Sequence, residues 1–213
     1  MGGYDDPLLH DFALHCAAWH VSHEVRPEPD FTVGTLRSHL QEAGVDAVWL
    51  PKVDPPTGRP EALPLLAALV HASPVMVWVS HPASVLPTHL TVAYDGNPHT
   101  QEALMVAASL AQSWSLPLHL RLITAQQVPP PGALCLAETS DRLASLGRAP
   151  TTAERYVGSA ATALSSATGP DTLLIMGTHW PQDRQWAWRD TTMDVVLQAA
   201  AGSVLVCPAP DLG

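Results

Sequence analysis

The strongest constraint on the fold is an alternation of apolar strands and helical segments from residue 90 to residue 208. Residues 90–94 are an apolar run suited to a buried parallel strand, and further strands are predicted at 118–123, near 154–157, at 171–177 and at 203–208. Helices are predicted between them, the first starting at Pro98 after an Asn97 cap and the second ending at Gly147. A short third helix ends before Gly169, and the last has the apolar stripe Met193, Val196, Leu197 and Ala200. This alternation predicts an α/β fold, with a parallel sheet covered by helices on both faces.

The earlier part of the chain repeats the later portion of this plan. "VDAVWL" (45–50) corresponds to "DTLLIM" (171–176), and "PVMVWVS" (74–80) corresponds to "SVLVCPA" (203–209). The repeat has no counterpart of the first strand, first helix and second strand. We therefore expect a truncated half-domain at residues 1–85 and a complete domain at residues 86–213.

The truncation would leave the predicted strand at 20–25 without hydrogen-bonded neighbours, because the strands that normally lie between it and the strand at 47–50 are missing. We expect it to move beside the strand at 47–50 through a right-handed crossover, giving a three-stranded half-domain. A partner chain that fills the gap is the alternative. The strand "PVMVWVS" is expected to pair with "SVLVCPA" within the chain, or with its own copy in a dimer.

Charge and cysteine content exclude several classes of function. Twenty acidic residues oppose ten basic ones, the net charge is −10, and Lys52 is the sole lysine. Binding to nucleic acid is not expected, because it requires a clustered basic surface. Cys16, Cys135 and Cys207 have no CxxC or disulfide-scaffold spacing, so we expect reduced, buried thiols.

A membrane location is not expected either. The start, "MGGYDDPLL", lacks the charged-then-apolar order of a signal peptide. The apolar stretch 62–79 is interrupted by Pro64 and Pro74, which favours a short helix followed by a buried strand. The expected location is the cytoplasm.

The residues that open and close the later part resemble the universal stress protein (UspA-like) family. "TVAYDGNPHTQEAL" (91–104) is similar to its first strand, Asp-Gly turn and helix. "DTLLIMGTH" (171–179), the last helix and "SVLVCP" (203–208) are similar to its closing portion. The resemblance covers residues 90–208 in full and 8–80 in part. It implies a flavodoxin-like, Rossmann-like sheet of strand order 3-2-1-4-5, with tandem copies or dimers packed through their last strands.

The resemblance also implies a place for a ligand. In this strand order the sheet reverses between strands 1 and 4, so Asp95-Gly96 and Gly177-Thr178 converge at a topological switch point. Many family members bind ATP there, with the residue equivalent to Asp95 touching the adenosine, and others bind no nucleotide. An Asp-Gly turn also needs no ligand to explain it, so both roles of Asp95 stay open.

A glycine pattern distinguishes the ATP-binding members of the family. It is a glycine after strand 4, two residues, a second glycine, nine residues, then Gly-Ser or Gly-Thr. Gly177 and Thr191 match this pattern, but Trp180 and Asp190 stand at the second and third glycine positions. A tryptophan fills space that phosphates need, and an aspartate repels their charge. We therefore expect a degenerate nucleotide crevice.

The alternative is a true ATP- or AMP-binding protein. Arg184 or Arg189 would then replace the missing loop contacts, and slow ATP hydrolysis in the same crevice is a third possibility. Three tryptophans of this region, Trp180, Trp186 and Trp188, either stack on a base or form an interface, and we favour the interface. The candidate cofactor-binding residues are Asp95, Gly96, Gly177, Thr178, Arg184 and Thr191.

Catalytic and metal-binding motifs are absent from the sequence. It contains no GxSxG elbow, no P-loop and no full dinucleotide fingerprint, so we assign no catalytic residue. His10, His15, His20 and His23 lack zinc-site spacing, so we assign no metal ligand. The sequence thus predicts a stress-related binding or regulatory protein that acts through protein contacts. No cofactor is the first expectation, ATP is the alternative, and the protein partner is unknown.

Overall fold

The computed structural model describes most of the chain from Gly44 onward and a few residues before it. By internal contacts the chain divides into two compact units, Met1–Thr32 and Val33–Gly213. Every helix and strand reported below belongs to the second unit. The described residues are 16–17, 22, 38–40, 42, 44–51, 66, 69–70, 73–81, 83–96, 98–124, 131–178 and 192–208.

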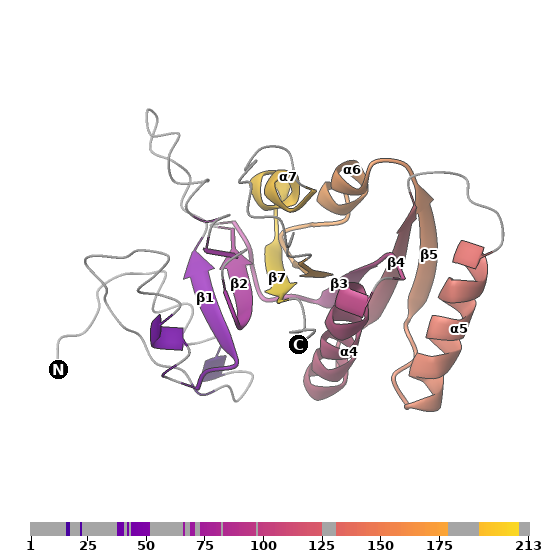
Figure 1. Ribbon diagram of the computed structural model, residues 1–213, viewed down its shortest axis with the longest axis horizontal. Helices are drawn as coiled ribbons and strands as arrows, with labels where there is room; N and C mark the ends of the chain where they lie inside the picture. Colours follow the sequence, from indigo (N-terminus) through magenta and orange to yellow (C-terminus); the bar gives the residue numbers. More distant parts are fainter. Residues whose placement is uncertain are drawn as a thin grey trace. The chain divides into compact units, whose positions relative to one another are not determined.

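A seven-stranded sheet forms the centre of this unit, within the residues that are described (Figure 1). Its strand order is β1-β2-β7-β6-β3-β4-β5. Neighbouring strands are parallel, except that β2 and β7 are antiparallel. The strands are β1 (Ala47–Pro51), β2 (Met76–Ser80), β3 (His89–Tyr94), β4 (Leu118–Thr124), β5 (Thr152–Val157), β6 (Thr172–Gly177) and β7 (Ser203–Cys207).

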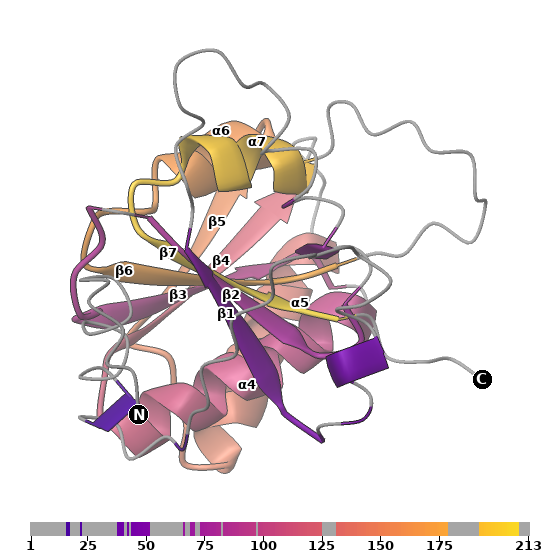
Figure 2. The ribbon, with the colours of Figure 1, turned by 90° about the vertical axis from the view of Figure 1, so that its left-hand side faces the viewer.

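Helices cover both faces of the sheet (Figure 2). One face carries α4 (Pro98–Trp114) and α5 (Pro131–Ser145), and the other carries α6 (Ala160–Ser165) and α7 (Thr192–Ala199). The core under α4 contains Ala103 and Ala107 packed with Leu120 and Ile175. The core under α7 contains Val196 packed with further residues from β2, β6 and β7.

Local chemistry explains where these elements start and stop. All of β7 and nearly all of β6 is buried, as expected for strands covered on both faces, and both read as continuous apolar runs. Gly147 adopts φ 71° just after α5, a left-handed conformation in which glycine avoids the strain of a side chain. Ser159 caps α6 by accepting the Thr162 N–H.

The predicted architecture of the later part is confirmed. The order β5-β4-β3-β6-β7 is the order 3-2-1-4-5, and all four predicted helices are present. The apolar stripe of the last helix is also confirmed, since Met193, Val196, Leu197 and Ala200 are all buried.

The earlier part adds β1 and β2 to the same sheet. The β2–β7 register pairs Val77 with Val206, Trp78 with Leu205 and Val79 with Val204, which confirms the pairing within the chain. Trp78 packs against the core under α4, and Val77 belongs to the core under α7. The two parts therefore share both cores. The predicted strand at 20–25 lies outside the described residues, and the boundary at residue 85 stays a prediction from the sequence repeat.

Within the described ranges, no helix is both long enough and apolar enough to cross a membrane.

Two cysteines are described as free, Cys16 and Cys207, and both are buried. Burial raises the pKa of the Cys16 thiol. Burial and, to a smaller extent, the Glu102 carboxylate raise the pKa of Cys207 to about 12. Both thiols are therefore protonated at neutral pH.

Candidate functional site

The switch point lies at the carboxyl ends of β3 and β6. The pairing of these two strands runs from His89–Thr172 to Val92–Ile175, although β3 continues to Tyr94 and β6 to Gly177. β3 stays paired with β4 as far as Tyr94, and β6 stays paired with β7 as far as Gly177. Among β4, β3, β6 and β7, the pairing at this edge is therefore lost between β3 and β6, where open α/β sheets place ligands.

Asp95 and Gly96 form the turn between β3 and α4. Asp95 is exposed, and its Oδ1 accepts a hydrogen bond from the Thr100 hydroxyl at 2.7 Å. Gly96 has φ 88°, a left-handed conformation that favours glycine. The carboxylate thus ties the turn to the first turn of the helix, which accounts for the Asp-Gly sequence without a ligand.

Gly177 and Thr178 lie at the end of β6. Gly177 is half-buried and is paired with Cys207 of β7. Thr178 is buried, and its backbone N–H donates to the Cys207 carbonyl at 2.9 Å. This N–H is therefore already used to extend the β6–β7 pairing. Among the four candidate residues that the structure describes, Asp95 and Gly96 form the exposed to half-buried turn.

The remaining candidate residues fall outside the described part of the chain. Arg184 and Thr191 belong to residues 179–191, which also contain Trp180 and Asp190. The structure thus places four of the six candidate residues at one edge of the sheet. Among the residues it describes, no three histidine, cysteine or acidic side chains are arranged to hold a metal ion.

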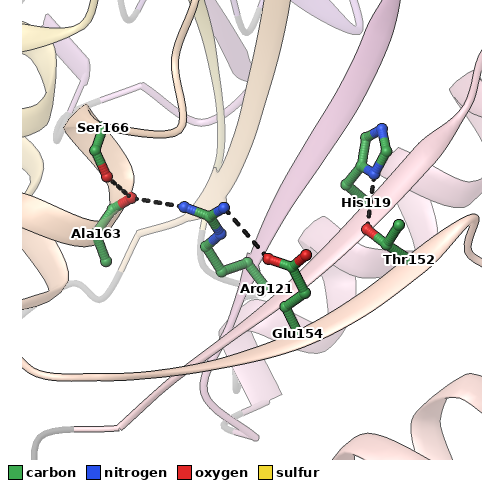
Figure 3. A network of polar contacts seen from close by, with 6 residues as sticks. All are labelled: His119, Arg121, Thr152, Glu154, Ala163 and Ser166. Carbon is green, nitrogen blue, oxygen red and sulfur yellow. Dashed lines mark hydrogen bonds and ion pairs between the residues drawn. The ribbon is translucent and has the colours of Figure 1, made fainter.

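A second polar cluster, which the sequence did not indicate, lies on the face that α6 covers (Figure 3). His119 Nδ1 lies 2.7 Å from the Thr152 hydroxyl. Two residues further on, Arg121 donates to the Ala163 carbonyl at 3.0 Å and lies 3.5 Å from the Glu154 carboxylate. The sequence contains a signal for this cluster, because polar residues stand at alternate positions of β4 (His119 and Arg121) and of β5 (Thr152 and Glu154). It could be interpreted only once the β4–β5 register was known, because that register pairs His119 with Thr152.

Solved structures match this arrangement over almost the whole chain. A universal stress protein from Archaeoglobus fulgidus matches with a TM-score of 0.70 and 17% identity, over 96% of this chain and 76% of its own. A structure assigned to the same family from Pseudomonas aeruginosa has a TM-score of 0.62 and 16% identity, over 99% of this chain and 81% of its own. The chain has the universal stress protein fold. A protein of unknown function from Pseudomonas aeruginosa shares it, with a TM-score of 0.61 and 17% identity over 99% of this chain and 80% of its own.

No protein-family model and no curated protein matches the sequence. The likeness to universal stress proteins is thus a likeness of fold, at sequence identities of 16–17%. Function has to be argued from the residues that this chain places on the universal stress protein fold.

Proposed function

We propose that this chain is a cytoplasmic, stress-related regulatory protein of the universal stress protein family that acts through protein contacts, with a degenerate nucleotide crevice. One observation carries the proposal: polar groups at the switch point are already bonded within the protein. The Asp95 carboxylate holds the Thr100 hydroxyl, and the Thr178 N–H holds the Cys207 carbonyl.

The residues that follow β6 support the same conclusion. Phosphate binding relies on free backbone N–H groups and on close approach of the ligand to glycine. The sequence has tryptophan at 180 and aspartate at 190, where the ATP-binding pattern has glycines. A net charge of −10 adds no general attraction for a triphosphate. A nucleotide would therefore meet bulk and negative charge in place of donors.

An exposed apolar surface supports the contact function. Val85 and Leu86, just before β3, are 56% and 43% exposed. The backbone around them is held in place, because the Val85 N–H donates to the Pro170 carbonyl at 3.0 Å and the Thr88 N–H donates to Asp171 at 2.9 Å. Adjacent aliphatic side chains on a fixed backbone are suited to binding another protein.

The alternative function is ATP or AMP binding. It is favoured by the exposed Asp95 carboxylate, by the left-handed Gly96 and by the loss of pairing between β3 and β6. Arg184 or Arg189 would supply the positive charge, and slow hydrolysis would be an extension of this function. The carboxylate would then exchange Thr100 for a ligand hydroxyl.

The nucleotide content of freshly purified protein distinguishes the two functions. Protein is denatured, and the supernatant is analysed by ion-exchange chromatography for adenine nucleotides. The proposal predicts far less than one nucleotide per chain, whereas the alternative predicts a stoichiometric amount that falls in Asp95→Ala. For the contact function, Val85→Ser/Leu86→Ser should abolish binding of a partner that the wild type retains. Val157→Ser, a change of an exposed aliphatic residue on β5, is the matched control.

A further inference from the structure

Two histidines are in contact at the edge of the sheet opposite the switch point, where β3 and β4 begin. The rings of His89 and His119 meet edge to face, with centroids 5.2 Å apart and planes at 84°. His89 uses both ring nitrogens: Nδ1 lies 3.1 Å from the Thr88 hydroxyl, and Nε2 lies 3.0 Å from the Thr172 hydroxyl. His119 Nδ1 is bonded to Thr152, as Figure 3 shows. We call Thr88, His89, His119, Thr152, Asp171 and Thr172 the histidine cluster.

The hydrogen bonds of the cluster fix the position of the proton on His89. The Thr88 hydroxyl donates its single hydrogen to Asp171 Oδ2 at 2.7 Å, so towards His89 it can only accept. Bonds from Thr88 and from the backbone N–H of Asp171 lower the pKa of the Asp171 carboxyl, which is consistent with an ionised acceptor. Neutral His89 therefore carries its hydrogen on Nδ1. Its Nε2 accepts from Thr172, whose oxygen accepts the Gly169 N–H at 3.1 Å. The Thr88 hydroxyl, both ring nitrogens of His89 and the Thr172 hydroxyl all have partners in this arrangement.

Hydrogen bonds of the cluster join segments that are distant in the sequence. Thr88 and Val85 lie in the connection from β2 to β3, and their N–H groups are bonded to the carbonyls of Asp171 and Pro170. Thr172 opens β6 and joins His89 of β3 through its hydroxyl. The connection that leads from the earlier part of the chain into the sheet is thus held at its end by the cluster.

Protonation opposes this arrangement in two ways. A proton on His89 turns Nε2 into a donor, so the Thr172 hydrogen loses its acceptor while Thr172 is buried. A charge on each ring places like charges in contact. The other charged groups nearby are Arg121 and Glu154 beside His119, and Asp171 beside His89. The Asp171 carboxylate attracts a charged His89 ring and so acts against the two effects above. On the helices of this face, α6 contains no ionisable side chain and α7 contains only Asp194.

The direction of the pH effect follows from His119. Its burial and the positive charge of His89 lower its pKa below the ordinary 6.5, Arg121 adds to this, and Glu154 acts in the opposite direction. The unfolded chain therefore binds more protons than the folded chain between pH 6.5 and the lowered value. The contribution of the neutral His119 ring to folding stability is therefore fully present above pH 6.5, and it is lost as the pH falls towards the lowered pKa.

We propose that the histidine cluster is a pH-sensitive fastener, which holds the 85–88 segment against residues 169–172 at neutral pH and releases it in mildly acidic solution. Two observed features carry the proposal: the ring contact, and the hydrogen-bond chain that is complete only with His89 neutral. The proposal is independent of nucleotide and of any partner.

Hydrogen exchange of the Val85 and Thr88 amides, corrected for intrinsic rates, tests the fastener at about pH 7.5 and about pH 5.5. In the wild type, the protection factors of both amides should fall by about tenfold or more on acidification. In His119→Gln, which removes the second charge but leaves His89 able to take up a proton, the fall should be clearly smaller than in the wild type. His39→Gln, a change of an exposed histidine outside the cluster, should retain the wild-type response. An equal fall in His119→Gln, or none in the wild type, overturns the proposal.

A second measurement applies to the wild type alone and does not depend on the variant folding. The ¹⁵N shifts of the His89 ring, recorded at about pH 8 where a histidine is neutral, report which nitrogen carries hydrogen. We expect hydrogen on Nδ1. Hydrogen on Nε2 would contradict the bonding on which the fastener depends.

Discussion

Replacing Gly202 by alanine should strongly destabilise the folded unit. Gly202 is buried in the turn that enters β7. A Cβ there would lie 2.1 Å from the Gly169 carbonyl oxygen and 2.6 Å from that of Thr172. Ordinary contact starts at 3.4 Å, so moving the first oxygen from 2.1 to 3.4 Å is a displacement of about 1.3 Å. Both obstacles are backbone atoms, so no rotamer change relieves them.

The displaced carbonyl also has a hydrogen bond to lose, because Gly169 accepts the Thr172 N–H at 3.0 Å. Overpacking of a core costs about 1–3 kcal/mol, and because two backbone atoms collide with the new methyl group, Gly202→Ala should cost about 3 kcal/mol. With a urea m-value of about 2 kcal/mol/M, the unfolding midpoint should fall by about 1.5 M.

Urea unfolding followed by far-ultraviolet circular dichroism measures this effect. The matched control is Gly147→Ala, at which the new methyl group meets nothing within 4 Å but φ is +71°. Left-handed strain alone should cost about 1–2 kcal/mol there. If Gly202→Ala lowers the midpoint no more than Gly147→Ala does, the collision argument is wrong.

Three further outcomes are expected. Trp78→Ala should lower the free energy of unfolding, measured by urea titration, by about 3 kcal/mol, because Trp78 packs on the core under α4 and its ring centroid lies 6.0 Å from that of Trp114. A loss below about 1 kcal/mol would contradict a core shared by the two parts of the chain. Cys207, with a pKa raised to about 12, should resist a maleimide at about pH 8 and react only after unfolding, as read by peptide mass spectrometry; rapid labelling of native protein would contradict its burial. Thr100→Val should cost about 0.5–1.5 kcal/mol in a urea titration by removing the bond to Asp95, and an unchanged midpoint would show that the bond does not hold the turn.

The sheet was predictable because its signals are local and its connections obey general rules. Apolar runs identify β3, β6 and β7, and parallel strands joined by right-handed crossovers leave few topologies. The β2–β7 pairing was predictable as one of two alternatives, because "PVMVWVS" repeats "SVLVCPA". Sequence alone could not choose between a partner within the chain and one in another chain.

The switch-point residues were predictable from topology, whereas their bonding was not. Asp95 follows β3 and Gly177 is the last residue of β6, and the sequence placed them together because these two strands end at the same edge. That the Thr178 N–H would be used by Cys207 depends on how far β7 extends, which a pattern of apolar residues does not specify.

The histidine cluster could not be predicted, because its contacts depend on register. His89 and His119 are separated by a helix in the sequence, and each by itself resembles an ordinary residue at a strand end. Their ring contact requires β3 and β4 to be in the observed register, in which Leu90 is opposite Leu118. Likewise, nothing in the sequence indicates that Gly202 lies against two carbonyl groups.

Calorimetric titration of nucleotide-stripped protein with ATP and Mg²⁺, at two temperatures, measures directly whether the switch point binds nucleotide. At protein concentrations about ten times a micromolar Kd, the account predicts no saturable heat at either temperature, for the wild type and for Asp95→Ala alike. Tight binding by the wild type that is lost in Asp95→Ala would contradict the degenerate crevice and establish nucleotide binding as the function.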